Sequence, residues 1–404
     1  MMRTNAERLL LEALRAAVHG VQVDWQAVSG EDWNALMELA AAHKALPLVV
    51  QAAYACPAAA QWDGFAQAKR LSRMQVAGQT LRTAEFRELW GFLERKGLRP
   101  LVVKGALCRA LYPNGALRQS ADEDLYIRPE DFARCCAALR EFGMACPQDA
   151  QEETDFEIGW RKPGGTLYIE LHRSLFEPGS DALGALPVLF DGALERAEPY
   201  EADGMTLCSL LPQEHLLYLL LHAYKHFIYS GFGIRQICDA GLWAQSYAAR
   251  IDFGQLREQL ERVHAAKFAA AVLAVAEDEL GIAIPERWEK DIDYGPMLDD
   301  VLRAGVYGSA DRSRLHSASL TLRAVGARRT GGRGGVWRSV FPRAADLRRT
   351  YPALKEHPAL LPYYWCKRLA AYRRETKHTE DDSAAESLRL ARERKKLLRR
   401  YGIL

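Results

Sequence analysis

The spacing of apolar residues predicts that the first part of the chain is entirely helical. Leucines and alanines recur three and four positions apart in two stretches, Leu9 to Leu14 and Leu36 to Ala42. Such residues share one face of a helix and bury it against neighbouring helices. We therefore expect helices throughout residues 1–95, with Trp25 and Trp33 packed between them.

The apolar pattern changes near Leu98, where short runs replace helical spacing. Runs of three to six apolar residues bounded by turn residues are typical of buried strands. Pro129 predicts the first position of an intervening helix, and Gly143 predicts its end. The predicted strands are Leu101–Val103, a strand through Asp122 and Asp124 that ends at Ile127, Phe156–Trp160 and Thr166–Leu171.

Helical spacing returns at Leu211, where Pro212 and Glu214 suit a helix start before the apolar run Leu216–Leu221. Residues 325–338 are rich in glycine and arginine and predict a flexible basic loop. A last, basic helix is expected at Ala384–Arg400. The pattern thus divides the chain into a helical region (1–95), an α+β core (96–208), a second helical region (209–300) and a basic, mostly helical C-terminal region (301–404).

The formal net charge of +2 conceals an uneven distribution. From Thr321 to the end, 21 Lys/Arg stand against 8 Asp/Glu, whereas the preceding 320 residues have 33 basic and 44 acidic residues. A basic region can bind phosphates of nucleic acid or of a membrane surface. It can equally be a solvated face, or a surface that docks on the acidic remainder of the protein.

The sequence offers no sign of a membrane span or a targeting signal. Its longest apolar run, Leu216–Leu221, is far shorter than the roughly 18 residues of a spanning helix. The N-terminus carries Glu7 and Glu12 and predicts an amphipathic helix. The eight cysteines form no C-x-x-C pair and are expected to be reduced, buried thiols, as at Cys208 and Cys366. We therefore expect a cytoplasmic protein.

Three carboxylates are the strongest candidates for chemistry. Asp122 and Asp124 are two residues apart on a predicted strand, so both side chains project from one face. Glu170 lies on another predicted strand, with Tyr168 and His172 on the same face. Carboxylates from neighbouring strands could hold Mg²⁺ together with substrate phosphate. An Asp-x-Asp pair alone is also common on solvated strands and turns. The neighbouring residues therefore decide between a metal site and a solvated pair.

Those neighbouring residues favour phosphate binding. Gly105 permits a close backbone approach at the start of a predicted helix, where amide groups attract phosphate. Lys104 and Arg118 supply cations suited to a polyphosphate.

Lys-Gly, Arg-x-x-x-Asp-x-Asp-Leu (Arg118 to Leu125) and Glu-Leu-His (Glu170 to His172) together resemble the uncharacterised nucleotidyltransferase family of the polymerase-beta-like superfamily. The resemblance covers about residues 90–240 and extends to His222, His226 and Asp239. Abortive-infection and toxin-type nucleotidyltransferases carry a similar Lys-Gly followed by Arg-x-Ser-x-Asp-x-Asp, which Arg118 to Asp124 also fits.

The resemblance implies an α+β fold, with a polymerase-beta-like core of mixed sheet and helices flanked by helical N- and C-terminal regions. It implies an enzyme that moves a nucleoside monophosphate from an NTP to a hydroxyl acceptor, which can be a small molecule, a protein or RNA. Mg²⁺ would be held by Asp122, Asp124 and Glu170, and Gly105, Arg118 and Ser120, together with Lys104, would meet the nucleotide.

Two residues depart from the family pattern. After the first strand the family usually has Gly-Ser or Gly-Gly, whereas this chain has Gly105-Ala106 and so lacks a hydroxyl that could contact phosphate. Glu123 stands between the aspartates, where the family usually has an apolar residue. Glu123 would face the core and would need a cationic partner there. The departures leave open a catalytically degenerate protein that binds a nucleotide or a partner. The basic C-terminal region motivates a third hypothesis, a toxin-type enzyme acting on tRNA or protein.

His222 and His226 lie four residues apart and share one helix face. This spacing can ligate zinc, but the segment lacks the glutamate of a metalloprotease motif. We expect these histidines to bond to backbone groups or to Asp239. The alternative is that they line the nucleotide or acceptor pocket, together with His172.

Overall fold

Helices occupy the N-terminal region, as the apolar spacing predicts. The computed structural model describes residues 3–23, 25, 28–229, 231–305, 347, 351, 353–367 and 384–404. Thr4 and Ser29 each begin a helix with a capping box, in which side chain and backbone satisfy each other's hydrogen bonds. The helices are α1 (Asn5–His19), α2 (Gly30–Ala42), α3 (Leu46–Ala52), α4 (Pro57–Gln61) and α5 (Phe65–Arg95).

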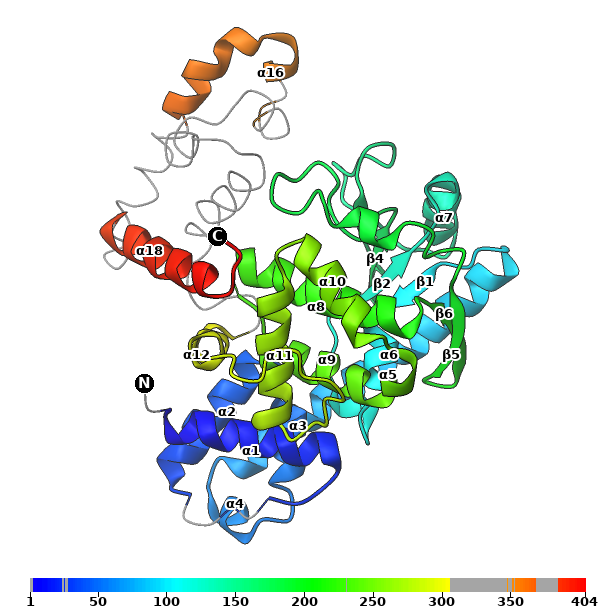
Figure 1. Cartoon of the computed structure of the whole chain (residues 1–404). Helices are drawn as coiled ribbons and strands as arrows, with labels where there is room; N and C mark the ends of the chain where they lie inside the picture. The colour runs from blue at the N-terminus through cyan, green and yellow to red at the C-terminus, as the bar shows by residue number, and fades with distance from the viewer. Residues whose placement is uncertain are drawn as a thin grey trace.

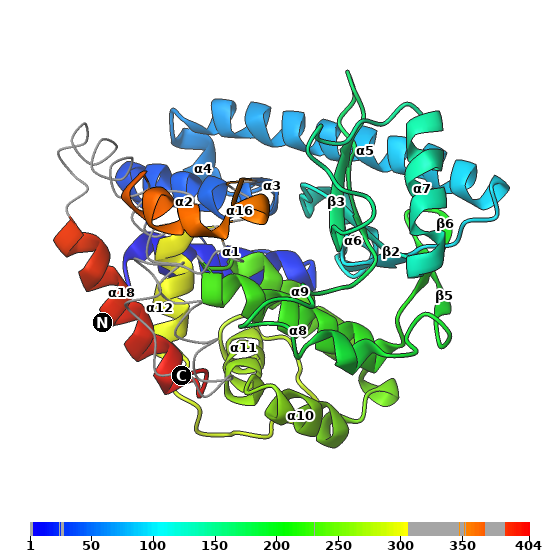
Figure 2. The ribbon, with the colours of Figure 1, turned by 90° about the horizontal axis from the view of Figure 1, so that it is seen from above.

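Helix α5 is the longest element in the described part of the chain and connects the N-terminal helices to the sheet. One end lies beside α2 to α4, and the other passes behind the sheet near α7 (Pro129–Glu141) (Figures 1 and 2). Its apolar side buries Phe86, Leu89 and Leu93. Residues of the N-terminal region therefore reach the strands that carry the candidate carboxylates.

The sheet has four strands in the order β1-β2-β4-β3. The central strands β2 and β4 are parallel, and the outer strands run antiparallel to them. The mixed sheet and flanking helices confirm the predicted fold class. The strands are β1 (Leu101–Val103), β2 (Glu123–Tyr126), β3 (Glu157–Arg161) and β4 (Tyr168–His172).

The alternation of side chains gives the sheet one polar and one apolar face. Leu125, Ile169 and Leu171 are fully buried on one face, with α5 and α7 supplying further core residues. Asp124 and Glu170 lie directly opposite each other and project from the other face. Asp122 precedes the first residue of β2, so the strand begins later than the sequence predicts.

Glu123 finds the cationic partner that its buried position requires. Short helix α6 (Gly105–Arg109) follows β1 and delivers Arg109, whose guanidinium lies 2.5 Å from Glu123. The other Glu123 oxygen accepts the Ala106 N–H at 2.9 Å. Both charged side chains are almost completely buried. Gly105 is required here, because it has a positive φ of 43° and a Cβ would collide with the Glu123 carboxylate.

A hairpin that the apolar pattern does not predict completes this part of the fold. Strands β5 (Glu198–Ala202) and β6 (Met205–Ser209) are joined by Asp203 and Gly204, both with positive φ. An Asp-Gly pair between alternating residues is a typical hairpin signal. Asp203 accepts two hydrogen bonds from Arg109, so the turn also anchors the buried ion pair.

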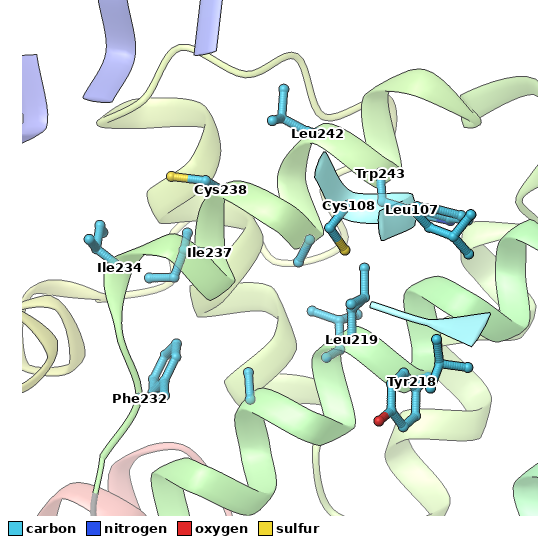
Figure 3. Packing of buried hydrophobic residues seen from close by; sticks show 14 of the residues in the cluster. Leu107, Cys108, Tyr218, Leu219, Phe232, Ile234, Ile237, Cys238, Leu242 and Trp243 are labelled. Atoms are coloured by element: carbon cyan, nitrogen blue, oxygen red, sulfur yellow. The ribbon is translucent and has the colours of Figure 1, made fainter. Parts of the chain in front are cut away.

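The second helical region packs against the sheet through α6. Leu107 and Cys108 of α6 meet Leu219 of α8 and Trp243 of α9 in one apolar cluster (Figure 3). The helices of the second helical region are α8 (Pro212–Tyr229), α9 (Ile234–Ser246), α10 (Phe253–Arg262), α11 (Ala266–Asp278) and α12 (Gly295–Ala304).

In the C-terminal region the structure describes α16 (Ala353–Glu356) and α18 (Ala384–Arg400), the second with the predicted bounds. The predicted basic loop at 325–338 lies outside the described residues. The eight cysteines are free thiols, but Cys366 is exposed and Cys208 is only partly buried, so the expectation of burial is wrong at these two positions. None of the helices in the described part of the chain combines the length and the apolar character that a bilayer crossing requires. The four predicted region boundaries remain a prediction.

The Glu123–Arg109 pair yields a test of the fold. Arg109→Met would leave Glu123 buried without its cation, which costs about 3–5 kcal/mol. Urea unfolding should show this loss, and adding Glu123→Gln should recover part of it. Arg128→Met is the matched control, because it removes an exposed ion pair with Glu195 and should cost less than about 1 kcal/mol. Equal losses in the two single variants would contradict the assigned role of the buried pair.

Candidate active site

Three side chains gather on the polar face of the sheet. Asp124 of β2 lies opposite Glu170 of β4, and His172 follows two residues later on β4. One ligand atom from each residue lies within 4.8 Å of the others, which makes a group able to hold a metal ion. The parallel pairing of β2 with β4 creates this group, because side chains at paired positions share a face.

Lys104 supplies the positive charge beside these carboxylates. Its ammonium lies 2.8 Å from Asp124 and 3.8 Å from Asp122. Lys104 has a positive φ of 62°, which is uncommon for a residue with a Cβ. Its backbone N–H donates to His215 at 3.1 Å, and this bond helps to hold the unusual conformation. The chain thus turns sharply between β1 and α6 and directs the lysine toward the carboxylates.

Burial and mutual repulsion set the protonation of the site. Burial, followed by the neighbouring charges of Asp124 and Asp122, raises the pKa of Glu170 to about 8. Burial also works to raise the pKa of Asp124, but Lys104 and His172 outweigh it and lower that pKa to about 2. Burial opposes the charge on Lys104, yet the two aspartates hold its pKa well above the usual value. At neutral pH one carboxylate of the facing pair is therefore ionised and the other is largely protonated.

His172 connects the carboxylates to a further charged pair. Its Nε2 lies 3.2 Å from Asp124, and its Nδ1 lies 3.5 Å from Glu157 of β3. Lys225 of α8 lies 3.9 Å from the same Glu157 oxygen. These partners orient the imidazole on the face that carries Asp124.

Asp122 opens the site toward a pocket on the helical side. It is less buried than Asp124, with 19% of its side chain exposed against 1%. The pocket collects three cationic side chains around this carboxylate, on walls from β1–α6, the segment before β2, α8 and α9. Its lining residues are Lys104, Gly105, Arg118, Asp122, Leu219, His222, Arg235, Gln236 and Asp239.

Arg118 and Ser120, which the sequence suggests as nucleotide-binding residues, already have partners in the fold. Arg118 makes two hydrogen bonds to Asp239, at 2.5 and 3.2 Å. Ser120 accepts a bond from Arg109 at 2.6 Å through its hydroxyl and donates its N–H to Gln79 at 2.8 Å. Arg118 still borders the pocket, whereas the Ser120 hydroxyl is committed to the interior. Their role in binding a nucleotide remains a prediction.

His222 and His226 lie beside Lys104. Their Nε2 atoms are 3.3 Å apart, and His222 Nε2 is 3.1 Å from the Lys104 ammonium. Burial, then Lys104, lowers the pKa of both histidines, that of His226 to about 3. Both are neutral at pH 7, so His222 can accept a hydrogen bond from Lys104. Asp239 is occupied by Arg118 and by the Tyr112 hydroxyl.

Sequence reasoning missed several residues that build the site. Arg109 and Glu157 are charged residues in a predicted helix and a predicted strand, where nothing marks them as buried partners. His215 lies at the edge of the apolar run of α8, and burial lowers its pKa to about 3. The apolar neighbours of His215 were the only sign in the sequence that it is buried. Its role as acceptor of the Lys104 N–H depends on the turn at Lys104, which the sequence does not predict.

Comparison with protein families matches residues 29–281 to the family described as uncharacterised nucleotidyltransferase. The match covers more than half of the chain and includes β1 to β6 and α2 to α11. The chain therefore belongs to this family and is a nucleotidyltransferase. No curated protein matches the chain, and no solved structure matches it.

The raised pKa of Glu170 predicts a pH dependence of stability in the absence of metal. Between an unfolded pKa near 4.5 and a folded pKa of about 8, the folded state binds more protons. Stability is therefore lost as pH rises through this window. One pKa unit corresponds to about 1.4 kcal/mol, and partial exposure of Glu170 reduces the effect to about 1–2 kcal/mol.

Glu170→Gln removes this titration and should flatten that part of the stability profile. Urea unfolding in EDTA at pH 5 and pH 8 measures the difference. The variant should be more stable than the native protein at pH 8 and similar to it at pH 5. The same pH slope in both proteins would show that Glu170 ionises normally.

Proposed function

We propose that the chain, as a member of this nucleotidyltransferase family, moves a nucleoside monophosphate from an NTP to a hydroxyl acceptor in the pocket beside Asp122 and Asp124. The observation that carries the proposal is the group formed by Asp124, Glu170 and His172 next to the Lys104 ammonium. Two carboxylates so close together in a buried place repel each other. Such an arrangement is typical of a site that serves a cation.

The donor atoms fit a divalent cation. Mg²⁺ favours oxygen ligands, which Asp124 and Glu170 supply, with Asp122 beside the same lysine. His172 suits Mg²⁺ less well as a ligand, and its hydrogen-bonding distance to Asp124 favours an orienting role. When bound, the ion would neutralise the triphosphate and stabilise the attacking and leaving oxygens.

The remaining chemistry falls to residues of this chain. Lys104, Arg118 and Arg235 line the pocket and present positive charge to a triphosphate. The acceptor oxygen forms a bond to the α-phosphorus, and the bond to the bridging oxygen breaks, which releases pyrophosphate. The hydroxyl proton passes to solvent or to a carboxylate of the site, since a bound cation would lower the pKa of Glu170 below the value of about 8 that it has without metal.

One contact favours the alternative of a catalytically degenerate binding protein. The N–H of Ala106, at the start of α6, donates to the Glu123 carboxylate. That amide is not offered to phosphate, and residue 106 has no hydroxyl. A protein with these features can keep a nucleotide or partner site without transfer. A toxin-type enzyme acting on tRNA or protein, with a phosphate-rich partner for the basic C-terminal region, remains a further prediction.

Binding of an NTP tests the proposal. An NTP should raise the melting temperature only when Mg²⁺ or Mn²⁺ is present. A ligand at about 100 times its Kd stabilises the folded state by about 2.7 kcal/mol. Asp124→Asn should abolish the shift, because it removes a ligand carboxylate and the partner of Lys104.

Asp131→Asn is the matched control, since Asp131 belongs to an exposed ion pair on α7. This variant should keep the full shift. A shift that persists in Asp124→Asn, or that needs no divalent ion, would place the nucleotide outside the carboxylate site.

A further inference from the structure

Helix α5 carries a row of polar residues that turns toward the start of the two carboxylate strands. Gln79, Arg82 and Glu85 are spaced three residues apart, so they follow one another along one side of the helix. Gln79 and Glu85 are buried, with 1% and 9% of their surface exposed. Polar side chains buried in a helix of this kind need hydrogen-bond partners, and they find them in two segments of the core.

The first segment is the stretch that leads into β2. Gln79 accepts the N–H of Ser120 at 2.8 Å. Arg82 donates to the carbonyl oxygen of Ser120 and, at 3.2 Å, to the side-chain oxygen of Gln79. Both backbone polar groups of Ser120 are thus bound by α5, two residues before Asp122 and four before Asp124.

The second segment is the stretch that leads into β4. Arg82 Nε donates to the Thr166 carbonyl oxygen at 3.2 Å. Glu85 accepts the N–H and the hydroxyl of Thr166, both at 2.9 Å, and the N–H of Leu167 at 2.8 Å. Burial works to raise the pKa of Glu85, but these bonds outweigh it and lower that pKa below its ordinary value. Glu85 is therefore charged and holds the chain four residues before Glu170.

Arg82 is the residue that touches both segments. Since β2 and β4 are parallel, their first residues lie at the same edge of the sheet, and one guanidinium can bridge them. Its donors lie in a rigid plane, so the bond to Ser120 and the bond to Thr166 set the distance between the two carbonyl oxygens. A flexible or shorter side chain would fix only one of them.

We propose that Arg82 is a positioning residue for the active site, which sets the spacing between the strands that carry Asp124 and Glu170. The inference rests on the proposed function, in that these carboxylates share a cation. It makes the N-terminal helical region part of the catalytic architecture, although α5 contributes no group to the pocket. A displacement of about 1 Å between ligands is enough to weaken a site severely.

The chain offers a matched control on the same helix. Arg87 also donates a hydrogen bond to a backbone carbonyl, that of Asp203 in the turn between β5 and β6. Among the residues that the structure describes, it makes no hydrogen bond to the segments before β2 and β4. Replacing Arg87 therefore removes a more exposed bond between α5 and the rest of the fold, and leaves the bonds of α5 to Ser120 and Thr166 in place.

The experiment measures Mn²⁺ affinity by calorimetry, well below the melting temperature of each variant. Changes in residues that orient metal ligands typically cost about 10–100-fold in affinity, so Arg82→Gln should bind Mn²⁺ at least about tenfold more weakly. Arg82→Lys, which keeps the charge but reaches one carbonyl at a time, should be intermediate. Arg87→Gln should bind like the native protein. Melting curves in EDTA identify variants that fail to fold.

Native-like affinity in folded Arg82→Gln would overturn the inference and leave the proposed function intact. If Arg82→Gln does not fold, native-like affinity in Arg82→Lys overturns it equally. An equal loss of Mn²⁺ affinity in Arg87→Gln would also overturn the inference. The affinity would then depend on any bond between α5 and the rest of the fold, not on the bonds of Arg82 in particular. A native protein that binds no Mn²⁺, or binds it unchanged after Asp124→Asn, would instead remove the cation site and the proposed function.

Discussion

The pairing of β2 with β4 places Asp124 against Glu170, and this repulsive contact governs the surrounding structure. The two carboxylates lie on a face that is largely shielded from water, where charges interact more strongly than at the surface. Lys104 reduces the repulsion from one side, and Glu170 reduces it by holding its proton until pH reaches about 8. Neutral His222 accepts a hydrogen bond from Lys104 without adding charge.

A second charged contact lies on the opposite face of the same strand. Glu123 points into the core and is neutralised by Arg109, which also binds Ser120 and the Asp203 turn. Glu123, one of the two departures from the family pattern, thus has a structural explanation, since through Arg109 it ties α6, β2 and the hairpin together. Its position against Gly105 also explains why that residue is a glycine. Gln79, Arg82 and Glu85 of α5 also bind the segments that lead into β2 and β4, so residues outside the pocket hold both carboxylate strands in place.

The sequence predicts those features that depend on local pattern. The run Leu101–Val103 and the alternation around Glu170 locate β1 and β4, because buried strands need apolar residues at regular spacing. The β5–β6 hairpin was missed although Asp203-Gly204 signals it, since its strands contain few strongly apolar positions. Partners that meet only through the fold, such as Arg109 for Glu123 or Arg82 for Ser120 and Thr166, leave no mark in the sequence. The candidate carboxylates could be named from the sequence. The sequence did not predict how Lys104 and the histidines are arranged around them.

The most direct measurement is the transfer of label from α-phosphate-labelled NTPs, with Mg²⁺, to acceptors in a cell extract. The account predicts a labelled product with native protein and with the surface variant Asp131→Asn, and none with Asp124→Asn, whose folding is checked by circular dichroism. Label transferred equally by Asp124→Asn would contradict the assignment of the site. No transfer from any NTP by native protein that still binds nucleotide would contradict the proposed reaction and favour the degenerate alternative.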